Sequence, residues 1–329
     1  MKSFSPIIIA FAFAFIAPTL ALHSQPASVQ QFQNSGFNEK MPPFPSLAAG
    51  TNAPDLYPGE STDVGPQRIL RLIPRHRYFG LLLDSQIFYT DNANFAPNGQ
   101  RIGSAVFINS VQAAFLPPDR KVGEGKISTS LGVASQWYNY GNDRIARLDF
   151  NAESVFLDAR YTRGLWMVDV NAAGNRLANQ SDYRETYREF LPSLTIQRLF
   201  PVTRAMVFAI GNQVDYHFTE QPSTFGSYAY INNRFDDITS VTFNWLVTPH
   251  FVVQPGYHFM FTNYRLNTLQ NGDRNDYLHS YGIALIYTFN DKFNVRTFFN
   301  YNSKTSDDRF AAAYEEFNGG LGVSLNLHF

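Results

Sequence analysis

The last stretch of the chain decides the fold. Residues 317–329 read FNGGLGVSLNLHF, with an apolar or aromatic side chain on nearly every second position. One face of this segment would carry Phe317, Gly319, Leu321, Val323, Leu325, Leu327 and Phe329, and the other would carry Asn318, Gly320, Gly322, Ser324, Asn326 and His328. Such alternation predicts a β-strand whose apolar face lies against a core or against lipid.

The same alternation repeats upstream as far as Phe79. Segment 251–263, for example, places Phe251, Val253 and Phe259 opposite Gln254 and His258. We expect about twelve strands, the even count typical of bacterial transmembrane barrels. They span residues 79–91, 103–115, 126–140, 145–160, 164–176, 186–200, 204–219, 233–248, 250–266, 276–290, 292–303 and 314–329.

The connections between these segments differ in length. Short turns fall at residues 162–163, 200–204, 247–250 and 289–292, while long polar loops intervene between them. Short turns at one end and long loops at the other predict an all-β, antiparallel up-and-down transmembrane barrel. Aromatic pairs near the predicted strand ends would form rings at the two membrane interfaces; these pairs are Tyr138 and Tyr140, Tyr216 and Phe218, Tyr287 and Phe289, and Phe299 and Tyr301.

The composition excludes several other classes of protein. The 329 residues include no cysteine, which excludes a disulfide scaffold, a thiolate zinc site and an iron–sulfur protein. Lysine and arginine number 26 against 27 acidic residues, so no basic excess is available for a nucleic-acid partner. Charged residues make up 16% of the chain, below the roughly 25% of an average soluble domain.

The N-terminus reads as a targeting segment. Lys2 precedes the apolar run IIIAFAFAFIA at residues 7–17, and a small-residue cleavage site follows at Ala21. We therefore expect a signal peptide at residues 1–21, a flexible Pro-rich periplasmic segment at 22–75 and the barrel at 76–329. The arginines at 68, 71, 75 and 77 form either a solvated basic approach to the barrel or a segment that plugs its lumen.

With the signal peptide, the alternating strands and a C-terminal Phe329, the chain resembles porin-like outer-membrane β-barrel proteins of Gram-negative bacteria. The resemblance implies contact with outer-membrane lipid and insertion by the barrel-assembly machinery. That machinery would read Leu321, Val323, Leu325, Leu327 and Phe329. Porin-like, nucleoside-channel, oligosaccharide-channel and phospholipase barrels of this size all exist, so the resemblance assigns no subfamily. We expect a monomer.

No catalytic or cofactor site is expected. His279 and Ser280 are adjacent and point to opposite faces of a strand, so they cannot form the base–nucleophile pair of a barrel phospholipase. Asp215, His217 and His258 could build a protease or metal site, but a hydrogen-bonded luminal network is the favoured interpretation. The sequence GEGKI at 123–127 lacks the upstream glycine and the hydroxyl residue of a phosphate loop.

The predicted registers place polar and charged residues inside the barrel. The candidate lumen lining comprises Asp84, Arg147, Asp149, Glu153, Asp169, Glu189, Asp215, His217, Asp236, His258, Arg296 and Glu316. Acids outnumber arginines eight to two in this list, a balance that favours cations or neutral polar solutes.

Barrel size limits the function further. Eight strands give a filled interior, while about 16 to 18 give a wide aqueous channel. About twelve strands predict a narrow passive channel for small polar or cationic solutes. The alternative is a closed barrel whose long loops bind a partner or a surface polysaccharide, for example through Phe225, Tyr228 and Tyr230. An outer-membrane phospholipase or protease is less favoured.

Overall fold

The computed structural model describes residues 77–222, 228–229, 233–264, 274–308 and 313–329. The predicted signal peptide, the Pro-rich segment and the arginines at 68, 71 and 75 lie outside the described residues. Phe225 and Tyr230 lie outside them as well, and the side chain of Tyr228 is not described.

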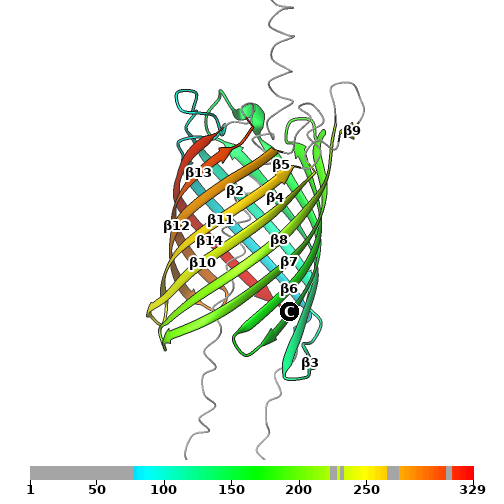
Figure 1. Cartoon of the computed structure of the whole chain (residues 1–329), viewed down its shortest axis with the longest axis vertical. Coiled ribbons are helices and arrows are strands. Elements are labelled where there is room, and N and C mark those ends of the chain that lie inside the picture. The colour runs from blue at the N-terminus through cyan, green and yellow to red at the C-terminus, as the bar shows by residue number, and fades with distance from the viewer. Residues whose placement is uncertain (1–76, 223–227, 230–232, 265–273, 309–312) are drawn as a thin grey trace, which may run out of the picture.

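Twelve long strands form one closed antiparallel barrel (Figure 1). The first strand pairs with the last from Gly80–His328 to Thr90–Asn318, so the sheet has no free edge in the wall. In chain order the wall strands are β1 (Phe79–Thr90), β2 (Ser104–Phe115), β4 (Gly125–Tyr140), β5 (Phe150–Arg163), β6 (Trp166–Asn179), β7 (Glu185–Thr203), β8 (Met206–Pro222), β10 (Arg234–Thr248), β11 (Phe251–Tyr264), β12 (Arg274–Asn290), β13 (Phe293–Ser306) and β14 (Tyr314–His328). The predicted architecture is confirmed.

Two short strands extend the wall beyond its ends. β3 (Arg120–Val122) pairs with the start of β4, and β9 (Tyr228–Ala229) pairs with the end of β8. The β3–β4 hairpin turns at Gly123, whose φ of 59° lies in the left-handed region that favours glycine. This hairpin explains why residues 116–125 look neither like a short turn nor like a long polar loop.

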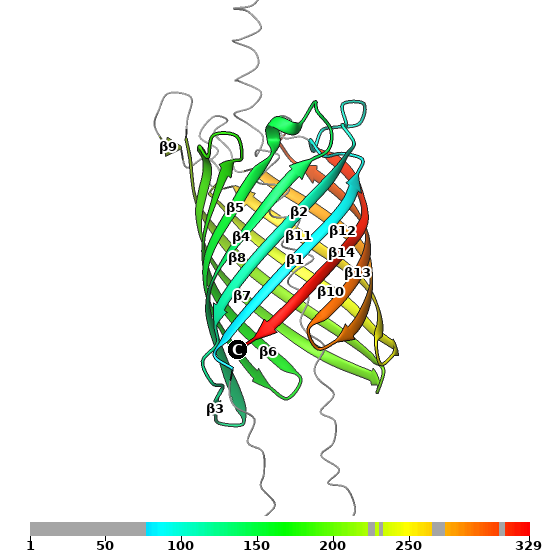
Figure 2. The ribbon, with the colours of Figure 1, turned by 180° about the vertical axis from the view of Figure 1, so that it is seen from behind.

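One predicted segment is wrong at its start. The alternation predicts a strand over 145–160, but a 3₁₀ helix, η1 (Ala146–Leu148), precedes β5. The remaining eleven segments each overlap one wall strand. The short turns and the C-terminus lie at one end of the barrel and the longer loops at the other (Figures 1 and 2).

Most of the outer surface of the wall is apolar. Val155, Val170 and Leu321 each expose more than half of their surface on the outward face, where a soluble barrel would present polar groups. Exposed rings gather near the short-turn end at Phe79, Phe115, Trp166, Trp245 and Phe289, and nearer the long-loop end at Tyr89, Phe190, Phe218, Tyr301 and Phe317. An apolar band between two aromatic belts is the exterior of a barrel that spans a membrane.

One of the four predicted aromatic pairs does not belong to these belts. Tyr138 and Tyr140 are buried inside the barrel, with exposed fractions of 0% and 5%. Phe218, Tyr287, Phe289, Phe299 and Tyr301 are on the outside as predicted.

No helix in the described ranges is long and apolar enough to cross a membrane.

Candidate functional site

The interior of the barrel is the candidate site, and apolar side chains fill part of it. Tyr138 of β4 and Phe150 of β5 stack with their ring centroids 4.2 Å apart. They belong to a buried cluster that also contains Phe88, Val106, Ile108, Tyr140, Ala152, Leu177, Tyr187, Ala284 and Phe298. Most of these residues lie in the half of each strand nearer the long loops, so the lumen is narrowed there.

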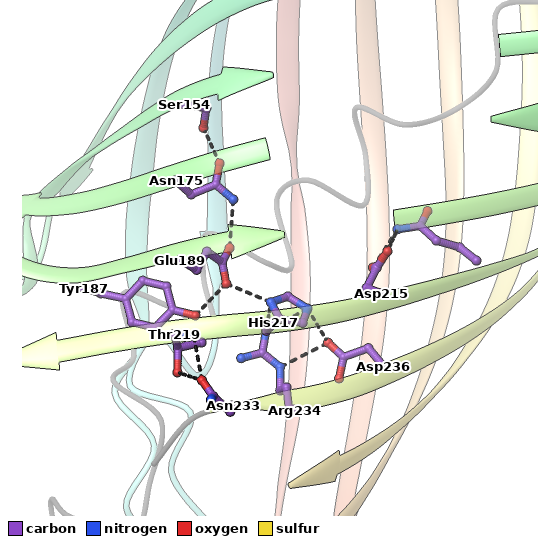
Figure 3. A network of polar contacts seen from close by, with 11 residues as sticks. Ser154, Asn175, Tyr187, Glu189, Asp215, His217, Thr219, Asn233, Arg234 and Asp236 are labelled. Carbon is purple, nitrogen blue, oxygen red and sulfur yellow. Dashed lines mark hydrogen bonds and ion pairs between the residues drawn. The ribbon is translucent and has the colours of Figure 1, made fainter. Parts of the chain in front are cut away.

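A charged network lies beside this apolar cluster (Figure 3). The two ring nitrogens of His217 each approach a carboxylate, with Nδ1 at 2.8 Å from Glu189 Oε2 and Nε2 at 2.9 Å from Asp236 Oδ2. Arg234 donates from Nε to Asp236 at 3.1 Å and places Nη2 within 3.3 Å of both ring nitrogens of His217. All four residues are nearly fully buried.

The network packs charged groups of both signs together. Each ring nitrogen of His217 faces a carboxylate, and Nη2 of Arg234 lies against the same ring, so His217 and Arg234 lie between Glu189 and Asp236. Buried charges persist in a protein only when they are paired and hydrogen-bonded in this way.

Neutral polar groups extend the network along the wall. Tyr187 donates to Glu189 Oε2 at 2.6 Å, and Asn175 donates to Glu189 Oε1 at 2.8 Å. Ser154 in turn donates to Asn175 at 2.7 Å. Side chains from β5, β6, β7, β8 and β10 are thereby linked into one polar band across the lumen wall (Figure 3).

A second cluster of charges continues the band on β12 and β13. Arg274 donates from Nε to Asp276 at 2.9 Å, and Lys304 Nζ lies 2.8 Å from the same carboxylate. The two cations also lie over tyrosine rings, at 4.4 Å from Tyr264 and 5.7 Å from Tyr314. This arrangement holds two cations against one carboxylate near the long-loop end.

Glu316 is buried without a cationic partner among the described residues. Its carboxyl accepts hydrogen bonds from Thr90 and Asn302, each at 3.0 Å. Glu316 therefore adds a buried carboxyl group to the inner wall on β14, where β14 pairs with β1.

The half of the lumen nearer the short turns differs from this. Some of its polar side chains are half-buried, as at Gln112, Asn171 and Gln213, while Gln197 and Gln254 are buried, and many of its inward positions hold glycine, alanine or serine. Arg160 and Asp169 form an ion pair at 2.8 Å on this wall. The interior thus has one half with many small inward residues and one half filled by aromatic rings and buried charged pairs.

Most of the predicted lumen residues face inward. Their side chains lie on the inward face of the wall; these residues are Asp84, Asp169, Glu189, Asp215, His217, Asp236, His258, Arg296 and Glu316. It brings Glu189, His217 and Asp236 into one network, whereas Asp84 and Arg296 form a separate pair on β1 and β13.

Three predicted lumen residues are misplaced. Glu153 lies on the same face of β5 as the exposed Val155 and Leu157, and it pairs with Arg176 on the outside at 3.0 Å. Arg147 and Asp149 lie in the η1 connection and not in a wall strand. Asp149 accepts a hydrogen bond from the Tyr140 N–H at 2.8 Å, and its partial burial raises the pKa of its carboxyl.

Six inward charged residues were missed: Asp158, Arg160, Arg234, Arg274, Asp276 and Lys304. Four of them are basic, so the acid excess of the lumen is smaller than the predicted eight to two. The available signal was the alternation with outward apolar neighbours, as at Asp158 beside Leu157 and Asp276 beside Tyr277, and it is lacking at Lys304, which lies between Ser303 and Thr305.

The described ranges contain no group of His, Cys, Asp and Glu side chains that could hold a metal ion. The predicted assembly residues share the outward face of β14, where Leu321, Val323 and Phe329 are exposed. The Phe329 N–H donates to the Phe79 carbonyl at 2.8 Å, which fixes the last residue against the first strand. The role of these residues in assembly stays a prediction.

No protein-family model matches the chain, and no curated protein matches it. Among solved structures, an outer-membrane channel from Pseudomonas putida F1 is similar with a TM-score of 0.51 at 8% identity, covering 77% of this chain and 96% of that chain. The NanC porin also aligns, with a TM-score of 0.43 at 11% identity, covering 74% of this chain and 100% of that chain. A KdgM porin in complex with disordered oligogalacturonate aligns with a TM-score of 0.41 at 9% identity, covering 75% of this chain and 99% of that chain. The closed twelve-strand wall and the similarity to the Pseudomonas putida channel show that the chain has the β-barrel fold of outer-membrane proteins.

Proposed function

We propose that this barrel is a narrow passive channel of the outer membrane for small polar solutes, with a weak preference for cations. The observation that carries the proposal is the inner wall itself. Polar and charged groups line it from the Arg160–Asp169 pair in one half to the Arg234 network in the other. A wall of this kind supports a hydrated path across the membrane.

The ion-paired half acts as the constriction in this proposal. Within the described part of the chain, Nη1 of Arg234 and Oδ1 of Asp236 are buried and have no hydrogen-bond partner. Unsatisfied buried groups of this kind are places where a water or a polar solute binds. An unpaired donor and an unpaired acceptor within the same buried network suit a solute with hydroxyl groups or a hydrated ion.

The selectivity follows from the charges. Acids still outnumber bases among the inward residues, although ion pairs cancel most of them. The remaining field attracts cations and repels anions weakly. Diffusion through the lumen needs no catalysis, and His279 and Ser280 face opposite sides of β12, so we expect no lipase or protease activity.

Planar bilayers test the channel directly. The purified barrel should give discrete conductance steps, and proteoliposomes should swell in small sugars but not in large ones. Correct folding is checked first by the altered gel mobility of the unheated barrel. A folded barrel that stays silent at all salts and voltages would refute the proposal.

A closed barrel is the second candidate, and the packing of the long-loop half favours it. Tyr138, Tyr187 and Arg234 are buried there almost completely. Such a barrel would act through its loops on a partner or a surface polysaccharide. Shortening the connection between β8 and β10 separates the two candidates, because a channel would still conduct and a loop-binding barrel would lose its ligand.

A further inference from the structure

The outward face of the barrel is not uniformly apolar. On β4 to β7 the outward residues include Leu131, Val133, Leu157, Val170 and Leu194, all exposed and aliphatic. The outward face of β5 to β8 also carries the ion pairs Glu153–Arg176 and Arg188–Glu220, and the face over β8, β10, β11 and β12 carries an amide, a carboxylate, hydroxyls and an imidazole. These strands are neighbours on the side that Figure 1 presents to the viewer.

The polar groups of this face touch one another on the outside of the wall. Asn212 of β8 donates to Asp237 Oδ1 of β10 at 2.6 Å and lies 3.4 Å from the Thr239 hydroxyl. Tyr257 of β11 and His279 of β12 are joined at 2.9 Å between the hydroxyl and Nδ1. We call Asn212, Asp237, Tyr257 and His279 the outer polar strip.

The outer polar strip lies within the apolar band. Asn212 is flanked on the outward face of β8 by Phe208 and Phe218, which belong to the two ends of the strand. Asp237 lies between Phe235 and Trp245 on β10 in the same way. Lipid tails cannot hydrogen-bond to a carboxylate or an imidazole, so these groups are costly if they face lipid.

Two atoms of the strip remain available. Among the described residues, Oδ2 of Asp237 and Nε2 of His279 have no hydrogen-bond partner. When the Tyr257 hydroxyl donates to Nδ1, the proton of a neutral His279 ring resides on Nε2, which then needs an acceptor. With the proton on Nε2, the strip offers one unpaired acceptor and one unpaired donor.

These two groups lie at nearly the same height in the membrane. Asp237 of β10 pairs with Phe261 of β11, and Phe261 pairs with Tyr277 of β12. His279 is two residues farther along β12. In Figure 1, moving from β10 across β11 to β12 at right angles to the strands leads toward the long loops. Moving two residues farther along β12 leads back toward the short turns. At a strand tilt of about 35–45° these displacements nearly cancel, leaving the groups roughly 10 Å apart sideways.

We propose that this face binds a second copy of the chain around a two-fold axis normal to the membrane that passes near Phe259 of β11. Such an axis exchanges left and right, so Asp237 of each protomer meets His279 of the other. The surface between them is aromatic, with Phe259 and His279 rings at 5.1 Å and Tyr257 and Tyr281 rings at 5.0 Å. Aromatic residues around a buried polar pair are typical of interface cores.

Because the chain has no cysteine, single-cysteine variants test the axis directly. Under oxidation Phe259→Cys should cross-link the folded barrel to itself in native membranes, because each copy places this position beside its partner's. Val155→Cys is the matched control, since Val155 is outward on β5 and far from the strip in the strand order. Equal cross-linking of the two variants would overturn the proposal.

The polar contact is tested by exchange. Asp237→His alone and His279→Asp alone should each raise the dimer dissociation constant about 30-fold or more, the effect of losing a hydrogen bond to a charged group. The double exchange should restore the dimer, which a merely misfolded single variant would not do. Asn109→Ala, at the outward Ser85–Asn109 pair of β1 and β2, should leave the dimer unchanged.

Mass measurement of the detergent-solubilised barrel at several concentrations identifies the occupant. Two copies of the chain support the proposal. A monomer, a monomer with bound outer-leaflet lipid, or a complex with a different protein would each overturn it, as would failure of the double exchange to restore the dimer.

Discussion

The Arg296 guanidinium on β13 reaches over β14 and binds the Asp84 carboxylate on β1 at 2.6 and 2.8 Å. Gly322 of β14 makes this possible, because a Cβ at that position would lie 2.9 Å from Cζ of Arg296. Ser324 accepts a further hydrogen bond from Arg296 at 2.8 Å. Three strands are therefore clamped from the inside at the place where the barrel closes.

Arg296→Met should destabilise the barrel strongly, because it leaves the Asp84 carboxylate buried without its cation. Breaking one partner of a buried pair costs about 3–5 kcal/mol of unfolding free energy. The double variant Arg296→Met with Asp84→Leu should recover most of this loss. Urea unfolding in lipid vesicles, followed by tryptophan fluorescence, measures both. The control is Arg163→Gln, whose ion pair with Glu124 is exposed, and an equal loss there would contradict the clamp.

Gly320 should tolerate no larger residue. A Cβ there would lie 2.3 Å from the Ile87 carbonyl oxygen and 2.3 Å from Phe88 Cβ. The rings of Phe88 and Phe298 also meet across this position with their centroids 5.9 Å apart. Gly320→Val should therefore sharply lower the fraction of barrel that refolds, as read from the gel mobility of unheated samples. Gly174→Val is the matched control, since no atom lies within 4 Å of its Cβ, and similar failure of both would refute this reason.

The sequence predicts the wall because lipid imposes one simple rule on every strand. Apolar residues alternate with polar residues wherever one face meets lipid and the other meets water. The rule fails at β5, where Phe150 and Phe156 point inward and Glu153 points outward. An interior that is itself partly apolar removes the contrast between the two faces, so the alternation there no longer indicates which face is inside.

The missed bases have a second cause. Arg274 and Lys304 lie just outside the predicted strands 276–290 and 292–303, because the observed strands continue past the apolar band. Neighbouring strands keep pairing through backbone hydrogen bonds beyond the membrane surface. The alternation of apolar and polar residues ends where the outward face no longer meets lipid. Contacts such as His217 with Glu189 and Asp236 join residues far apart in sequence, and no local pattern predicts them.

Ion preference should depend on inward acids and not on the misplaced ones. The combined variant Asp158→Asn, Asp169→Asn and Asp215→Asn removes negative charge from the lumen and leaves Arg160 without its carboxylate. The reversal potential in a potassium chloride gradient should therefore shift toward anion preference. Glu153→Gln with Asp149→Asn should leave it unchanged, because one lies outside the barrel and the other in a loop. A shift in the control variant would contradict the assigned lining.

Arg234→Gln should widen the proposed constriction and change its charge. Arg234 is one of the largest fully buried side chains and lies against His217 and Asp236, so its loss frees space and removes one positive charge. Glutamine retains a donor for Asp236, which limits the loss of stability. We expect larger single-channel conductance and stronger cation preference. Arg188→Gln is the control, since Arg188 is exposed on the outward face beside Glu220. If the native barrel is silent and only the Arg234 variant conducts, the network closes the native lumen. This result would refute the channel and support the closed barrel that acts through its loops.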